Sequence, residues 1–91
     1  MYIMDIVSLA IEFIGTLLLV YVILVTGNPY AIGATLALII ATGGKVSGGH
    51  FNPAVTSSLV VANKFGKDML LPYIVAQLLG GLVGYQLYKF T

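Results

Sequence analysis

The sequence predicts an all-α membrane protein with three transmembrane helices and one re-entrant half-helix. Of its 91 residues, 59% are hydrophobic and only 8% are charged, which leaves too little polar surface for a water-soluble domain of this size. Three apolar segments approach or exceed the length needed to cross a hydrocarbon core about 30 Å thick. Between the second and third of them lie a glycine-rich loop and a short apolar helix.

The first predicted span covers residues 6–26 and contains a single charged residue, Glu12. No Lys or Arg precedes the apolar run, and Glu12 interrupts it, so we expect a retained span rather than a cleaved secretory signal. The sequence Gly27-Asn28-Pro29 predicts a turn at its end.

The second and third predicted spans cover residues 30–46 and 69–88. The most apolar part of the second span is short and ends before Gly43-Gly44, so its full length depends on the helix continuing towards Val46. Small residues recur at every fourth position in both spans, which predicts closely packed helices. These rows are Gly33, Ala37 and Ala41, and Ala76, Gly80 and Gly84.

Residues 47–62 are expected to form a re-entrant loop and half-helix. Asn52 is a strong N-cap and Pro53 suits the first helical position, so a helix should begin here. About ten residues make a helix of about 15 Å, half the thickness of a bilayer. Because irregular backbone at that depth is tolerated only inside protein or beside a water-filled cavity, this element indicates a solute or ion pathway.

The run SGGHFNPAVT, together with EFIGT in the first span and AQLLGG in the third, resembles the major intrinsic proteins, which are aquaporins and aquaglyceroporins. Members of that family usually contain two inverted repeats, each with three spans and one Asn-Pro-Ala half-helix. The resemblance runs from about Ala10 to Tyr85 and covers one repeat. It implies that residues 1–91 form a single aquaporin-like repeat and a passive channel rather than an enzyme.

The resemblance places Asn52, Pro53 and Ala54 at the pore centre. The positive end of the half-helix would repel cations there, and the amide hydrogens of Asn52 would donate to a passing solute. The residues before the cap would present backbone carbonyls along the pore, as they do in the family; these are Gly48, Gly49, His50 and Phe51. His50 either faces the solute or holds the loop in shape, and we favour the second role.

Glu12 is costly inside a span, and such a residue is by default a candidate functional group. In the family, the matching glutamate is buried and accepts hydrogen bonds from the re-entrant loop. We favour this supporting role for Glu12 over a proton relay, and the resemblance gives Gln77 a similar one. No second histidine or nearby carboxylate suggests a metal site at His50, and no cofactor is expected.

Family water channels carry an Arg just after their second Asn-Pro-Ala motif, where this chain has Val55, and the chain contains no Arg at all. By position in the motif, Ile32 from each of two copies, with Gly49 and Val55, would line the constriction. We therefore expect permeation by water and small neutral solutes such as glycerol. Whether protons are excluded stays open.

One repeat needs a partner, because its polar cap would otherwise meet lipid. The simplest partner is an identical copy forming an antiparallel homodimer, and four dimers would make a homo-octamer. A second protein of opposite topology is the alternative, as are a regulatory half-repeat within another channel and an ion or proton channel. Nothing suggests nucleic-acid binding. Dual insertion is expected, with a slight bias to a cytoplasmic N-terminus from Lys45, Lys64 and Lys67 against Lys89.

Overall fold

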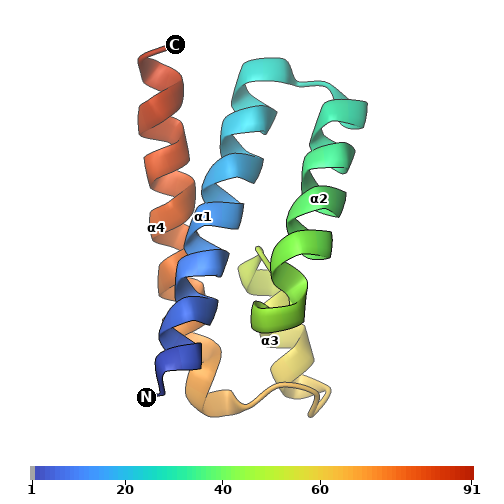
Figure 1. Ribbon diagram of the computed structural model, residues 1–91, viewed down its shortest axis with the longest axis vertical. Coiled ribbons are helices and arrows are strands. Elements are labelled where there is room, and N and C mark those ends of the chain that lie inside the picture. Colours follow the sequence, from blue (N-terminus) through green and yellow to red (C-terminus); the bar gives the residue numbers. More distant parts are fainter. Residues whose placement is uncertain (1) are drawn as a thin grey trace.

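The structure, a computed structural model, describes residues 2–91 as four α-helices and one short 3-10 turn, with no strand in that range (Figure 1). The helices are α1 (Ile3–Thr26), α2 (Pro29–Ser47), α3 (Pro53–Val61) and α4 (Leu70–Lys89), and the 3-10 turn Lys67–Met69 leads into α4. The predicted all-α fold class is therefore confirmed. Three of these elements are long and apolar enough to cross a membrane.

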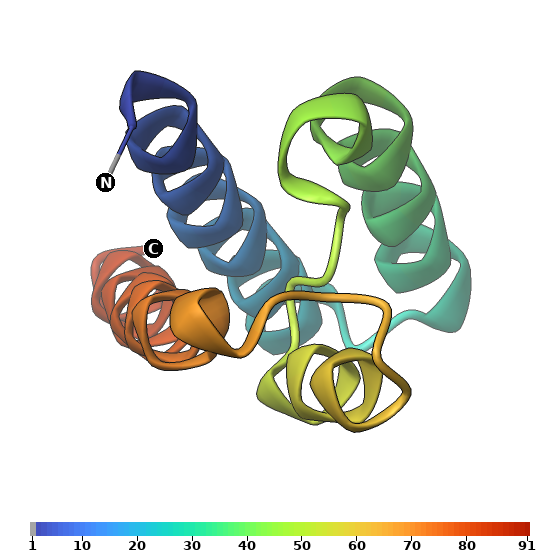
Figure 2. The same ribbon diagram turned by 90° about the horizontal axis from the view of Figure 1, so that it is seen from below.

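Helix α1 rises from the N-terminal end of the molecule, and α2 descends beside it (Figure 1). The chain then turns back, and α3 occupies only the half of the molecule nearest the N-terminus, before α4 rises along the other side of α1. Seen from the end, α3 lies in the angle between α4 and α2 (Figure 2). At 1.5 Å per residue, α1 is about 36 Å long and α3 only about 14 Å, so the length of α3 is about half the thickness of a bilayer.

Asparagine followed by proline starts both α2 and α3. Asn28 Oδ1 accepts hydrogen bonds from the backbone N–H groups of Tyr30 and Ala31, at 2.9 and 3.1 Å. Asn52 Oδ1 accepts one from Ala54 N–H at 2.8 Å. Helix α2 continues through the two glycines at 43 and 44 and ends at Ser47, where it is capped by Gly48, whose φ of 92° is left-handed. The second span is therefore long enough to cross a membrane, because the helix continues past Val46.

Helix α4 packs closely against α1 because two of its glycines leave room for the α1 backbone. A side chain on Gly80 would collide with the carbonyl of Phe13, and a Cβ on Gly84 would come within 2.6 Å of the carbonyl oxygen of Leu17. The row predicted in the third span is therefore used inside the fold. The row in the second span is not: Gly33 has open space where its side chain would be.

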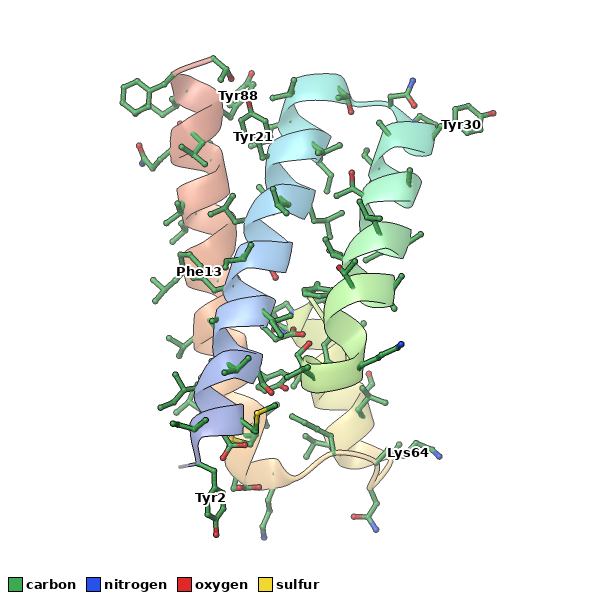
Figure 3. The ribbon with its side chains drawn as sticks, viewed as in Figure 1. Tyr2, Phe13, Tyr21, Tyr30, Lys64 and Tyr88 are labelled. Carbon is green, nitrogen blue, oxygen red and sulfur yellow. The ribbon has the colours of Figure 1, made fainter. Side chains whose placement is uncertain are left out.

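The molecule is polar inside and apolar outside, the reverse of a water-soluble domain. Its buried side chains include seven polar or charged ones, Ser8, Glu12, Thr16, Ser47, His50, Thr56 and Gln77, against three hydrophobic ones, Ile39, Phe51 and Tyr73. Tyrosines mark both ends: Tyr21, Tyr30 and Tyr88 lie at one end and Tyr2 at the other (Figure 3). Such aromatic belts occur where a membrane meets water. The chain is an integral, multi-pass membrane protein.

Candidate functional site

The loop that leads into α3 is held by one buried carboxylate on α1. Glu12 has no exposed surface, and its two oxygens accept four hydrogen bonds. Oε1 accepts from Phe51 N–H at 2.7 Å and from Gln77 Nε2 at 2.9 Å. Oε2 accepts from Ser47 Oγ at 2.8 Å and from His50 N–H at 3.1 Å. An ionised carboxylate only accepts hydrogen bonds, so four donors match it.

The backbone of this loop is satisfied on its N–H side only. The N–H of Gly48 donates to Gly44 O, that of Gly49 to Ser47 Oγ, and the next two to Glu12. The carbonyl oxygens of residues 48–51 accept no hydrogen bond from any group in residues 2–91. Four successive carbonyls are therefore free to accept hydrogen bonds from a donor outside this chain.

Three residues of the loop are held in left-handed backbone conformations: Gly48 and Gly49, with φ of 92° and 68°, and Phe51, with φ of 53°. Glycine adopts this region freely, whereas phenylalanine does so at a cost. The Phe51 side chain is 2% exposed and lies against Gly15 of α1, where a larger residue would collide with the ring. Burial of the ring and the short bond to Glu12 together fix this strained residue.

The tip of the site is exposed at the start of α3. Asn52, Ala54 and Val55 are all exposed, and Pro53 is partly buried. Asn52 uses its side-chain oxygen to cap the helix. Its Nδ2 group makes no hydrogen bond within residues 2–91, so both amide hydrogens are free to donate. The start of the half-helix therefore presents unused hydrogen-bond donors at the middle of the molecule (Figure 1).

His50 points away from this tip and into the protein. It is 6% exposed, and its Nδ1 lies 2.8 Å from Thr56 Oγ1. Gln77 Nε2 also donates to Thr56 Oγ1, at 2.9 Å, and thereby connects this pair to Glu12. The ring packs against Phe65 and Tyr73, with centroids 4.7 and 5.0 Å away.

Sequence reasoning missed several residues that support the loop. Tyr73 Oη donates to the carbonyl of Ser47 at 2.6 Å, and Ser8 Oγ shares its hydrogen between the carbonyls of Met4, at 2.9 Å, and Val46, at 3.2 Å. These bonds satisfy two of the carbonyls that the end of α2 leaves without helical partners. Thr56 joins His50 to Gln77. A hydroxyl in an apolar helix was the only sequence signal, and it is too common to single these residues out.

The three proposed constriction residues do not meet within one chain. Ile32 lies in the first turn of α2, whereas Gly49 packs near Gly44, twelve residues further along that helix, or about 18 Å at 1.5 Å per residue. The side chain beside Gly49 is that of Ile40, 3.4 Å from where a Cβ would stand. Val55 is on α3, 40% exposed.

No group of three or more potential metal ligands occurs within residues 2–91.

Comparison with known proteins gives a consistent picture. The profile of the family described as major intrinsic protein matches residues 25–91. Aquaporin-8 of Mus musculus is 51% identical over 57 residues, covering 63% of this chain and 22% of that protein. The glycerol uptake facilitator protein-like 6 of Lactiplantibacillus plantarum is 37% identical over 81 residues, covering 79% of this chain and 38% of that protein.

Aquaporin Z of Photorhabdus laumondii is 36% identical over 91 residues, covering 84% of this chain and 39% of that protein. The chain thus spans between about a fifth and two fifths of the length of these curated relatives. No solved structure matches it significantly.

Proposed function

Because the chain belongs to the major intrinsic protein family, we propose that it forms half of a passive channel for water and small neutral solutes such as glycerol. The pore arises where two half-pores of opposite orientation meet at their Asn-Pro-Ala motifs. The observation that carries this proposal is the one-sided loop: its N–H groups are bound to the protein, and its four carbonyls, with the amide of Asn52, are left for a solute.

These groups suit water and polyols. A hydroxyl compound donates its hydrogens to carbonyl oxygens and accepts hydrogen bonds through its own oxygen. A file of such molecules can pass along the carbonyls of residues 48–51 and turn its oxygen towards the amide of Asn52. No ionised side chain is required at the tip. In this proposal Glu12 and Gln77 support the loop and touch no solute, and His50 shapes it.

Cation exclusion in this pore rests on the half-helix. The N-terminus of α3 carries about half a positive elementary charge, and a second half-helix facing it would double that charge at the membrane centre. Val55 stands where family water channels have an Arg, so the further barrier that an Arg supplies is absent. A leak of protons is the specific alternative that Val55 favours.

An identical, inverted copy is the simplest source of the second half. A twofold axis in the membrane plane would bring the exposed Asn52 and Ala54 of two chains together and bury them. It would also place Ile32 of one copy at the depth of Gly49 and Val55 of the other, so each mouth would have one such constriction. Four of these pairs, eight chains, would reproduce a tetramer of pores.

Such a pair requires insertion in both orientations. Lys45, Lys64 and Lys67 belong to the N-terminal end of the molecule and Lys89 to the opposite end, so the positive-inside rule gives only a small preference for a cytoplasmic N-terminus. Two orientations of one chain are therefore accessible. A half-pore supplied by another protein would instead make this chain a regulatory or structural subunit.

Stopped-flow light scattering on proteoliposomes tests the channel. Vesicles containing the protein should change volume faster than empty vesicles under an osmotic gradient of sucrose, and also under one of glycerol. Val55→Trp should abolish the difference by filling the pore, whereas Val61→Trp, 88% exposed at the outer end of α3, should preserve it. Equal rates for protein-containing and empty vesicles would disprove the proposal. A pH-sensitive dye inside the same vesicles detects a proton leak.

A further inference from the structure

A polar cavity opens at the N-terminal end of the molecule, separate from the exposed tip of α3. Its volume is about 520 Å³, which falls in the range of about 300–1,000 Å³ that is usual for ligand pockets. It lies between the start of α1, the end of α2, the far end of α3 and the start of α4. Its polar lining consists of Asp5, Ser8, Lys45, Ser47, His50, Lys64 and Tyr73.

The side chains that can still donate in this cavity suit an anion. Helices α1 and α4 begin at this end of the molecule and α2 and α3 finish there, so their terminal partial charges largely cancel. On the lining itself, Lys45 and Lys64 stand against one carboxylate, Asp5. A second carboxylate, Glu12, lies behind Ser47 and His50, and its oxygens are already taken by four donors. Asp5 is already engaged, since its Oδ2 accepts the N–H of Tyr2 at 3.0 Å in the first turn of α1. Two lysines of the lining are left to face an anion.

Deeper in the cavity, one ring nitrogen of His50 is without a partner in residues 2–91. Nδ1 is taken by Thr56, and the Nε2 side faces Gly48. A Cβ at Gly48 would lie 2.9 Å from Nε2 and would cover it, so this glycine keeps the nitrogen open. His50 lines the cavity and is more than nine-tenths buried.

The hydrogen-bond distances favour the tautomer in which this nitrogen is a donor. Gln77 donates to Thr56, so the hydroxyl hydrogen of Thr56 must go elsewhere. Its contact with Asn52 O is 3.4 Å, whereas that with His50 Nδ1 is 2.8 Å, which is the better hydrogen bond. In that tautomer Nδ1 accepts and the ring carries its hydrogen on Nε2, on the side of Gly48, which also lines the cavity.

The hydroxyl groups of the cavity add no competing donors. Ser8 donates to backbone carbonyls, Ser47 to Glu12, and Tyr73 to Ser47 O. The donors that remain are Lys45, Lys64 and the Nε2–H of His50. We propose that this cavity binds the phosphate group of an anionic phospholipid, with the two lysines at the rim and His50 at the base.

The position of the cavity favours a lipid as the source of the phosphate. Helix α1 is about 36 Å long, against a hydrocarbon core of about 30 Å, so its first turns reach the headgroup region. Asp5 and Ser8, which line the cavity, are in those turns. Lys64 lies at the same end of the molecule as Tyr2 (Figure 3). Basic pockets at this level between transmembrane helices are suited to anionic headgroups.

Native mass spectrometry of the detergent-purified protein tests the site. The probes are phosphatidylglycerol and phosphatidylcholine with the same acyl chains, and the expected result is preferential retention of phosphatidylglycerol. Each lysine near an anionic headgroup contributes about fivefold in affinity, so Lys45→Gln with Lys64→Gln should weaken retention about 25-fold. Single changes of Lys67 and Lys89 should leave it unchanged, because neither lines the cavity.

Lys67 is the decisive control, because it lies at the same end of the molecule as the cavity. An equal loss in Lys67→Gln would mean diffuse attraction to a basic surface and would overturn the proposal. So would equal retention of the two lipids, or full retention in the double variant. Displacement of phosphatidylglycerol by inorganic phosphate at equimolar concentration would assign the cavity to free phosphate instead of a lipid.

Discussion

Replacing Glu12 by Gln is the sharpest perturbation of the loop, because it changes one oxygen to an NH2 group and keeps the size. Each carboxylate oxygen accepts two hydrogen bonds, so the NH2 group must face two donors whichever way the amide turns. At the Oε1 position it would oppose Phe51 N–H and Gln77 Nε2. At the Oε2 position it would oppose Ser47 Oγ and His50 N–H.

The second orientation is the less costly one. The hydroxyl of Ser47 can turn to the carbonyl of Gly43, 3.4 Å away, and accept from the new NH2 group. Only the N–H of His50 then stays buried without an acceptor, at a cost of about 1–3 kcal/mol. The first orientation would strand Phe51 N–H and a Gln77 donor and would cost about twice as much. We therefore expect a loss of stability of about 1–3 kcal/mol, concentrated in the loop.

Two assays measure this loss. Thermal unfolding in detergent, followed by size-exclusion chromatography, should show a lower midpoint for Glu12→Gln, and osmotic permeability in proteoliposomes should fall because the carbonyls of residues 48–51 are no longer aligned. Asp5→Asn is the matched control, since it also converts a carboxylate to an amide on α1 but lies outside this network. Unchanged stability and permeability in Glu12→Gln would refute the supporting role of this residue.

The remaining predictions concern packing, the end of α2 and selectivity. Gly80→Ala should destabilise the α1–α4 interface by about 1–3 kcal/mol, measured by thermal unfolding, because the added methyl meets the α1 backbone, whereas Gly33→Ala, with open space around it, should not. Tyr73→Phe should cost about 1–3 kcal/mol in the same assay by leaving the buried carbonyl of Ser47 unpaired. Val55→Arg should reduce glycerol permeation more than water permeation in stopped-flow measurements; equal reduction of both would argue against Val55 as a constriction residue.

Much of the fold could be predicted because it depends on local chemistry and on length. Asn52-Pro53 predicted the start of a helix, and Asn52 caps α3. The same pair at Asn28-Pro29 was interpreted as a turn, and Asn28 also caps a helix, α2. The apolar lengths predicted three spans, which the structure contains. The glycines at 43 and 44 did not end α2, because a helix inside a membrane keeps its backbone hydrogen bonds satisfied where water cannot replace them.

The support of the loop could be predicted only in part. Glu12 and Gln77 stood out because a charge in a span is rare and because both fall in motifs that the family resemblance supplied. Ser47, Thr56 and Tyr73 did not, since their bonds join residues 21 to 35 positions apart and depend on how the helices pack. A single sequence does not show how each helix is rotated about its own axis relative to its neighbours. The separation of Ile32 from Gly49 follows from their positions at opposite ends of α2.

The most direct test of two inverted half-pores meeting at the membrane centre is disulfide crosslinking. The chain has no cysteine, so Ala54→Cys introduces a single thiol at the exposed tip of α3. An inverted pair brings the two copies of this position together, within the 4.4–6.8 Å between Cα atoms that a disulfide needs. Val61→Cys, seven residues and about 10 Å further along the helix, would lie about 20 Å or more from its counterpart. We predict that oxidation of proteoliposomes produces a dimer with Ala54→Cys and none with Val61→Cys. A dimer with Val61→Cys but not with Ala54→Cys would contradict the proposed pore.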